Sequence, residues 1–428
     1  MNFLRIDGMK RIISLIIVGL LCFSMFIAFT PNVKAQSTVD WWSTFRHDLA
    51  HSGSSTSKGP LTNALLWNYT TGNSIEYSSP SVVNDVVYIG SYDHYVYALN
   101  AATGTYIWSY KTGGAIDSSP AVADGMLYIG SEDHKVYALN AATGAFDWSY
   151  KTGSGVESSP AVTNGVVYVG SDDNKVYALN AATGVKEWSY NTGSSVVSSP
   201  AVVNGVVYFG SEDDNVTALS ASTGNVIWSY ATGDEVDSSP AVVNGVVYIG
   251  SNDYDVYALN AVNGAFIWSF STGDIVDSCP AVANGIVYIG SEDYNVYAIN
   301  ATSGSKIWSY PTGSQVESSP AVADGVVYVG SDDHNFYALN AATGATIWTY
   351  GTGYLVDSSP AVANGVVYVG SNDYNLYAFG AITVPQPSPP VPSPTIPEIP
   401  NQALTFTLVA TMACAAVAVI AAKKKKIN

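Results

Sequence analysis

The chain has 428 residues, of which 34 are acidic and 16 are basic, giving a formal net charge of −18. This acidic balance argues against nucleic-acid binding, which depends on basic patches that release counterions from the phosphates. Only three cysteines are present, and Cys22 and Cys414 lie in apolar terminal segments. No disulfide framework is therefore expected, and stability must come from packing.

The amino-terminal segment has the features of a secretory signal peptide. Basic residues up to Arg11 precede an apolar run over residues 12–29, and Val33-Lys34-Ala35 offers small residues at the positions that a signal peptidase prefers. We predict a signal peptide over residues 1–35, with an uncleaved membrane anchor as the alternative.

Residues 36–60 form a lead-in to the main part of the chain. They include two of the ten tryptophans, Trp41 and Trp42. Large aromatic side chains are rarely left in water. We therefore expect the lead-in to pack on the domain that follows, residues 61–381.

That domain consists of near-copies of one unit, which repeat with a period of 40 residues. Residues 158–193 typify the unit, SSPAVTNGVVYVGSDDNKVYALNAATGVKEWSYNTG. A fixed period of this length indicates an array of one supersecondary unit. The marker prolines are Pro80, Pro120, Pro160, Pro200, Pro240, Pro280, Pro320 and Pro360. The marker tryptophans, to which we assign a structural role, are Trp67, Trp108, Trp148, Trp188, Trp228, Trp268, Trp308 and Trp348.

Each unit is predicted to form four short strands. In the unit above they cover residues 159–162, 166–169, 176–179 and 186–190. Asn164-Gly165 is the favoured pair for a two-residue hairpin with positive φ at both positions. The second and third strands are apolar on both faces, as expected when other sheets cover both sides. Radially stacked four-stranded sheets give that arrangement, so each unit is predicted to be a blade of a β-propeller.

The order of the markers predicts the number of blades and the way in which the ring closes. Eight three-strand sets each begin with a marker proline, but the Trp67 strand precedes the first set and no tryptophan strand follows the last. The Trp67 strand should therefore complete the last blade. The fold class is all-β, an eight-bladed propeller whose closure hides the edge strands that would invite aggregation.

The carboxyl-terminal segment is predicted to anchor the chain in a membrane. Residues 382–401 are rich in proline and form a semi-rigid stalk. Residues 402–422 are apolar and long enough to cross a bilayer, and the lysines of residues 423–428 should stay on the cytoplasmic side. We therefore expect the propeller on the extracellular side of the cell membrane, attached by a single transmembrane helix.

The blade text Val-Tyr-Ala-Leu-Asn-Ala-Ala-Thr-Gly-x-x-x-Trp resembles the tryptophan-docking repeat of eight-bladed pyrroloquinoline-quinone dehydrogenases, over roughly residues 67–379. The same repeat occurs in non-enzymatic relatives, including the propeller lipoprotein of the bacterial β-barrel assembly machine. The segment from Trp41 to Gly53 resembles the lead-in of those non-enzymatic members. The tail from Pro397 onward is similar to archaeal envelope anchoring tails, although Ile399 departs from the more common aromatic residue.

The resemblance to the dehydrogenases implies a quinone capped by a disulfide between adjacent cysteines and bound beside calcium. The chain has no adjacent cysteines, and Cys279 stands where other blades have serine. The uniform blades also lack the converging, dissimilar groups of an active site. We therefore expect no catalysis and no quinone, and favour a binding or scaffold module for a protein or glycan partner in the cell envelope. A quinone- or metal-dependent oxidoreductase is the alternative.

Acidic residues recur three positions before the marker prolines, where they should surround one mouth of the central channel. They are Asp117, Glu157, Asp237, Asp277, Glu317 and Asp357, with Tyr77 and Val197 in the other two blades. An oxygen-rich ring suits calcium, and plain solubility of an acidic rim is the alternative. A further aspartate follows each second strand (Asp93 to Asp373), where capping of a turn is the favoured interpretation.

One position in that turn varies on an otherwise uniform scaffold. It is occupied by His94, His134, Tyr254, Tyr294, His334 and Tyr374. These side chains sit on different blades and are too dispersed for one metal, so we predict a surface that contacts a partner. Asn68, Asn215 and Asn300 begin glycosylation sequons.

Overall fold

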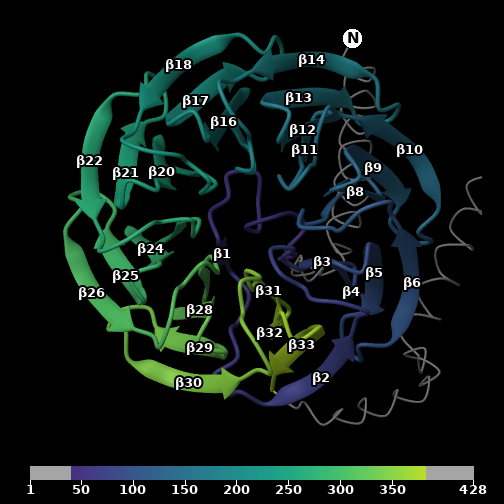
Figure 1. Ribbon diagram of the computed structural model, residues 1–428. Helices are drawn as coiled ribbons and strands as arrows, with labels where there is room; N and C mark the ends of the chain where they lie inside the picture. The colour runs from purple at the N-terminus through teal and green to yellow at the C-terminus, as the bar shows by residue number, and fades with distance from the viewer. Residues whose placement is uncertain (1–39, 382–428) are drawn as a thin grey trace, which may run out of the picture. The chain divides into compact units, whose positions relative to one another are not determined.

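The computed structural model describes residues 40–381, which form eight β-sheets around a central axis (Figure 1). Each sheet has four antiparallel strands of the repeat, ordered from an inner strand to an outer strand. The predicted all-β, eight-bladed propeller is therefore confirmed. Within residues 40–381 there is no helix with the length and apolar character that a membrane crossing requires. The predicted signal peptide, stalk, membrane helix and lysine tail lie outside the described residues.

The strands of each class have similar lengths in all blades. The inner strands are β3 (Ser81–Val83), β7 (Ala121–Ala123), β11 (Ala161–Thr163), β15 (Ala201–Val203), β19 (Ala241–Val243), β23 (Ala281–Ala283), β27 (Ala321–Ala323) and β31 (Ala361–Ala363). The second strands are β4 (Val86–Gly90), β8 (Met126–Ser131), β12 (Val166–Ser171), β16 (Val206–Ser211), β20 (Val246–Gly250), β24 (Ile286–Ser291), β28 (Val326–Ser331) and β32 (Val366–Gly370). The third strands are β5 (Tyr95–Asn100), β9 (Lys135–Asn140), β13 (Lys175–Asn180), β17 (Asn215–Ser220), β21 (Asp255–Asn260), β25 (Asn295–Asn300), β29 (Asn335–Asn340) and β33 (Asn375–Gly380). The outer strands are β2 (Leu65–Thr70), β6 (Tyr106–Lys111), β10 (Phe146–Lys151), β14 (Lys186–Asn191), β18 (Val226–Ala231), β22 (Phe266–Ser271), β26 (Lys306–Pro311) and β30 (Thr346–Gly351).

The hairpin between the inner and second strands has the predicted backbone geometry. Asn164 and Gly165 have φ angles of 51° and 76°. The first blade lacks the glycine and places Asn84 and Asp85 at φ 51° and 62°. Two left-handed residues match the twist of the flanking strands, so this turn sets the register of every blade.

The core lies between neighbouring blades. Strands such as β12 and β13 bury four or more consecutive residues, because a sheet covers each face. The outer strand β10, in contrast, buries only Trp148. The burial pattern is therefore that of sheets packed face to face around an axis.

The tryptophan of each outer strand docks on the neighbouring blade. Trp108 donates a hydrogen bond from Nε1 to the carbonyl of Ala141 at 2.9 Å, and the Tyr88 hydroxyl donates to the same carbonyl at 3.1 Å. All eight marker tryptophans donate in the same way to a carbonyl one blade further on. The tryptophans therefore join the blades to one another.

The ring closes between the two ends of the domain (Figure 1). Strand β2 pairs with β33, with Trp67 opposite Ala378. In the seventh blade, Trp348 Nε1 and the Tyr328 hydroxyl donate to the carbonyl of Pro60 at 3.0 and 2.9 Å. The start of the domain thus supplies both the missing outer strand and the docking carbonyl that the last blade lacks.

Two closed belts of hydrogen bonds surround the central channel and explain the Ser-Ser-Pro text. In the first, the first serine of each blade donates its hydroxyl to the equivalent carbonyl of the next blade, as Ser118 does to Ser158 at 3.1 Å. In the second, the backbone N–H of the second serine donates to the next hydroxyl, as Ser119 does to Ser159 at 2.9 Å. Cys279 occupies one position of this second belt, where its Sγ accepts from the N–H of Ser239 at 3.1 Å.

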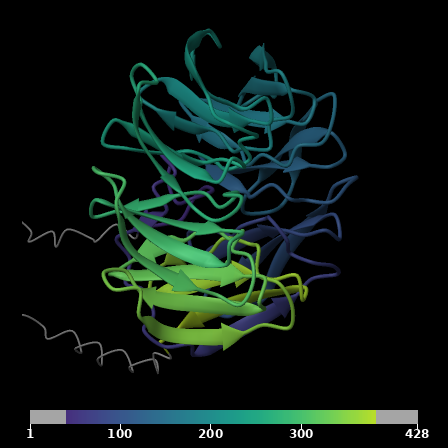
Figure 2. The same ribbon diagram turned by 60° about the vertical axis from the view of Figure 1, so that its left-hand side comes forward.

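The lead-in crosses the centre of the ring (Figures 1 and 2), where its carbonyls bond to the inner strands. Carbonyls from Trp42 to Gly53 accept hydrogen bonds from the backbone N–H groups of six inner strands, at Val82, Val122, Val202, Val242, Val282 and Val322. The short strand β1 (Ser54–Ser55) adds a parallel pairing with β27. The lead-in therefore occupies the end of the channel, a path that the sequence did not indicate.

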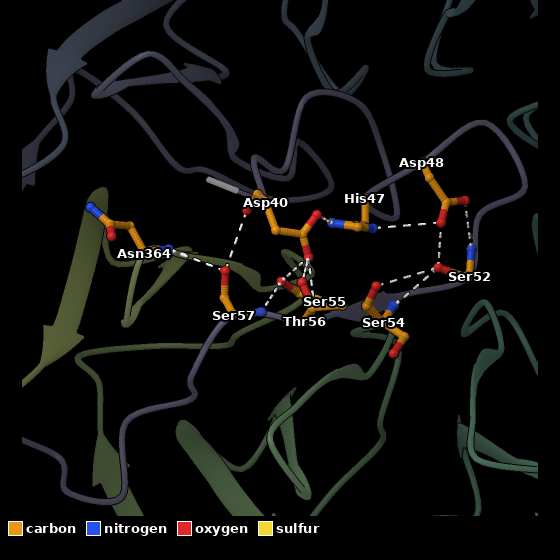
Figure 3. A network of polar contacts seen from close by, with 9 residues as sticks. All are labelled: Asp40, His47, Asp48, Ser52, Ser54, Ser55, Thr56, Ser57 and Asn364. Carbon is orange, nitrogen blue, oxygen red and sulfur yellow. Dashed lines mark hydrogen bonds and ion pairs between the residues drawn. The ribbon is translucent and has the colours of Figure 1, made fainter. Parts of the chain in front are cut away.

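Side chains of the lead-in fix its course. Asp40 accepts hydrogen bonds from Ser55 and Thr56 and lies 3.0 Å from Nε2 of His47, as Figure 3 shows. Arg46 is 1% exposed and donates from Nη1 to the carbonyl of Ser319 at 3.0 Å. Such a network makes one path of the segment strongly preferred.

Replacing Gly53 should loosen this segment. Gly53 has a φ of 62°, and a Cβ there would lie 2.8 Å from the Cβ of Ala281 and closer still to the Arg46 guanidinium. We expect Gly53→Ala to lower the free energy of unfolding by about 2 kcal/mol or more, because steric overlap adds to backbone strain. Gly125→Ala is the control, since Gly125 also has a positive φ but no atom within 4 Å of an added Cβ. Equal losses in chemical denaturation of the two variants would show that Gly53 matters only through its backbone angle.

Candidate functional site: the acidic mouth of the channel

The six acidic residues that precede the inner strands surround one cavity of about 340 Å³ on the ring axis. Tyr77 and Val197 complete the ring, as the sequence predicts. Phe45 of the lead-in, Cys279 and the second-belt serines also line this cavity. The lead-in thus bounds this cavity on one side, and acidic residues surround its mouth.

These carboxylates are more buried than a solvated rim would be. Asp117 and Asp357 are 6% and 7% exposed, and the other four are half-buried. Plain solubility, the alternative interpretation of the ring, does not explain side chains that the protein withdraws from water. Burying a carboxylate is costly unless a partner compensates.

A second tier of side chains lies directly outside the first. Its acidic members are Glu132, Asp172, Glu212, Glu292 and Asp332, and Tyr92, Asn252 and Asn372 occupy the same position in the remaining blades. The turn that carries them is held against the loop before the inner strand, as shown by the bond from the Glu132 N–H to the Ala115 carbonyl at 3.0 Å. This tier was not identified from the sequence, although its period of 40 residues was a usable signal.

Burial, followed by mutual repulsion, raises the pKa values of the carboxylates at the mouth. The pKa of Asp117 rises to about 7, that of Asp277 to about 8 and that of Glu317 to about 7. Burial is the first cause in each case, and neighbouring carboxylates are the main further contributors that raise the pKa. The pKa of Asp357 is also raised, by burial and by the adjacent Asp332.

Neutral donors compensate some of these groups but not all. Asn252 donates to Asp237 at 3.0 Å, and Asn372 donates to Asp357 at 2.7 Å. The Tyr77 hydroxyl of the first blade donates to Glu317 of the seventh blade at 3.3 Å. None of the ion pairs found among residues 40–381 involves a carboxylate of the mouth. The mouth therefore presents an excess of negative charge.

The turn aspartates have a structural role, as the capping interpretation predicts. Asp93 accepts from the N–H of Tyr95 at 2.9 Å through one oxygen, and from the Gly72 N–H and the Tyr97 hydroxyl at 2.6 Å through the other. The same bonds recur at Asp253. Asp93 and Asp253 close a turn and tie it to the loop of the preceding outer strand, and with both oxygens engaged they have little capacity for a ligand.

The six varied turn positions lie in the turn that carries the second tier, further from the axis. Their backbones are left-handed, with φ between 69° and 75°. Asn174 and Asp214 occupy the position in the other two blades, and such residues tolerate this conformation better than tyrosine does. Tyr254, Tyr294 and Tyr374 are 45–50% exposed. Bulky side chains kept at a strained position around the mouth are consistent with the predicted contact surface.

The glycosylation candidates are partly engaged in hydrogen bonds. Asn68 lies exposed on β2 and donates to Asn375 at 3.1 Å, and Asn215 donates to the carbonyl of Asp213 at 2.7 Å. Asn300 accepts from the N–H groups of Thr302 and Ser303.

A protein-family model matches residues 56–160, 151–274 and 252–383, and its description is outer membrane protein assembly factor BamB. These stretches cover most of the chain and all eight blades. The chain belongs to this family. No curated protein matches the chain.

Members of the BamB family and several quinoproteins share the fold. BamB from Moraxella catarrhalis is 20% identical with a TM-score of 0.66, and the match covers 74% of this chain and 99% of that protein. A europium-containing methanol dehydrogenase is 15% identical with a TM-score of 0.69, over 80% of this chain and 98% of the enzyme. Quinohemoprotein alcohol dehydrogenase from Comamonas testosteroni is 17% identical with a TM-score of 0.69, over 80% of each chain. At these identities the likeness establishes the fold alone.

Proposed function

We propose that this chain is a non-enzymatic binding module on the extracellular side of the cell membrane, where it docks a protein partner over the acidic mouth of its propeller. The observation that carries the proposal is the double tier of partly buried carboxylates without a basic partner among the described residues. Lysine or arginine side chains of a partner would supply the missing charge.

Two further features support a docking face. The closed ring, its hydrogen-bonded belts and the lead-in make the mouth a rigid surface, which reduces the entropy lost on binding. Exposed tyrosines surround it, including Tyr77 at 50% and Tyr354 at 51% exposure. Tyrosine is enriched at protein interfaces. The description of the family as an assembly factor is consistent with a protein as the partner.

The oxidoreductase alternative fits the cavity poorly. Pyrroloquinoline quinone carries several carboxylates, whereas the cavity is lined by carboxylates, hydroxyls, Phe45, Val197 and Cys279, with no lysine, arginine or histidine. Bringing an anionic cofactor into this field would be unfavourable. Reduction of a dye by the purified full chain after addition of the quinone and calcium would overturn this part of the proposal.

A zero-length carbodiimide cross-linker tests the docking face on intact cells, because it joins a carboxylate to an amine only where the two are in contact. We expect a protein linked to the propeller through its mouth. The double variant Asp237→Asn with Glu317→Gln should lower the yield at least about tenfold, a loss of about 1.4 kcal/mol in binding.

The matched control is Asp147→Asn with Glu187→Gln, which removes the same charge from exposed positions on β10 and β14. Its cross-linking should be unchanged. An equal loss in both double variants would indicate general charge attraction, and the absence of any linked protein would refute docking at the mouth.

A further inference from the structure

Three carboxylates of the second and third blades converge at one side of the mouth. Oxygens of Asp117, Glu132 and Glu157 all lie within 4.8 Å of one another. They come from the loop before β7, the turn between β8 and β9, and the loop before β11. Within the described residues, no other group of three or more acidic, histidine or cysteine side chains meets this distance.

One buried oxygen on each of two members of this group has no hydrogen-bond donor among the described residues. Asp117 is 6% exposed, and its Oδ1 is buried without a partner among the described residues. Oε1 of Glu132 and Oδ1 of the adjacent Asp172 are in the same condition. An unsatisfied buried carboxylate oxygen is costly, and a cation held between these oxygens would offset that cost.

The residue equivalent to Glu132 four blades away, Glu292, provides an internal comparison. In the sixth and seventh blades, Gln315 donates from Nε2 to Glu292 at 2.6 Å and so compensates the carboxylate equivalent to Glu132. The position equivalent to Gln315 in the third blade is Gly155. A Cβ on Gly155 would lie 2.6 Å from Oδ2 of Asp172 and 2.7 Å from Oε2 of Glu132.

Gly155 is unique at this position of the repeat. The other blades have side chains there, namely Ser74, Ala115, Ser195, Glu235, Ile275, Gln315 and Leu355. Because Gly155 has no side chain, the carboxylates of Glu132 and Asp172 approach its backbone at the place where the other blades have a Cβ.

We propose that Asp117, Glu132 and Glu157 form a divalent-cation site that takes calcium, with Asp172 alongside and Gly155 providing the space. Calcium binds oxygens at about 2.3–2.6 Å, so two of its ligands can lie up to about 5 Å apart, whereas two ligands of magnesium can lie at most about 4.2 Å apart. Oxygens that all lie within 4.8 Å of one another can therefore share a calcium ion. Water completes the coordination sphere, because calcium takes six to eight oxygens and tolerates irregular geometry. The site goes beyond the proposed docking function and does not depend on it.

The test is calorimetric titration of the purified full chain, in detergent and freed of metal by a chelator, with calcium chloride. We expect one calcium ion per chain, and at least tenfold weaker binding of magnesium. Glu132→Gln and Gly155→Gln should each weaken calcium binding at least about tenfold. The second variant keeps every carboxylate and adds the side chain that the seventh blade carries, in the space that the carboxylates of Glu132 and Asp172 occupy.

The matched control is Glu292→Gln, which makes the same change in the sixth blade. It should bind calcium as the unaltered chain does. Near-ultraviolet circular dichroism at pH 5 shows whether each variant has kept its fold, and Glu157→Gln replaces any variant that has not. No calcium binding by the unaltered chain, or equal weakening by Glu132→Gln and Glu292→Gln, would overturn the proposal, since the second result is that of diffuse attraction to an acidic surface.

Discussion

A chain that begins at Gly72 should fail to fold into a stable ring, whereas one that begins at Asp40 should unfold in a single cooperative transition. The shorter chain lacks β2, the docking carbonyl of Pro60 and the lead-in carbonyls that bond to six inner strands. It exposes the edge of β33, which then becomes a template for pairing with other chains. We expect it to aggregate, as measured by size-exclusion chromatography and by loss of the calorimetric transition.

A permuted chain separates ring closure from the role of the lead-in. Placing residues 64–71 after Ala381 through a short turn would give the last blade the connectivity of the other seven. We expect this chain, begun at Gly72, to recover a monomeric ring with a lower melting temperature, because it still lacks the lead-in. If it aggregates as the truncated chain does, closure by β2 is not what holds the ring together.

The thermal stability of the chain should fall as the pH rises from 6.5 to 8.5 in the presence of a chelator. Burial and neighbouring carboxylates raise the pKa of Asp277 to about 8 and that of Glu317 to about 7. Over this range the folded chain holds protons that the unfolded chain, with ordinary carboxyl pKa values, has already lost. For each proton that only the folded chain holds, the free energy of unfolding falls by about 1.4 kcal/mol for every unit by which the pH rises. We therefore expect the melting temperature to fall by about 5 °C over this range.

The titration of His51 sets the lower limit of this pH range, and two variants test the contribution of the mouth. Burial lowers the pKa of His51 to about 4, which makes stability rise with pH below about 6.5 and would mask the effect there. Asp277→Asn should flatten the slope and raise the melting temperature at pH 8.5, because it removes one of the repelling charges. Asp147→Asn, on the exposed face of β10, should leave the slope unchanged. A melting temperature that rises steadily from pH 6.5 to 8.5 would contradict the placement of the carboxylates in a buried, mutually repelling ring.

The sequence alone determined the repeated part of this protein. The hairpin at Asn164-Gly165, the doubly apolar strands and the marker tryptophans are local signals that recur every 40 residues, so each confirms the others. Closure by the Trp67 strand followed from the order of the markers. The Trp67 strand precedes the first three-strand set, and the last set lacks an outer strand, so the two were expected to form one blade. The ring of six carboxylates was likewise predicted, since equivalent positions of the repeat lie at the same distance from the ring axis in every blade.

The path of the lead-in, the contacts between neighbouring blades and the burial of the carboxylates could be determined only from the tertiary structure. The lead-in has no repeat and no periodicity, and its path depends on which backbone N–H groups the inner strands leave unpaired. The group of Asp117, Glu132 and Glu157 spans two blades, and the contrast between Gly155 and Gln315 acquires meaning only when each faces the second tier of the preceding blade. Burial also came from the structure, because it is the packing of eight blades around one axis that withdraws Asp117 and Asp357 from water.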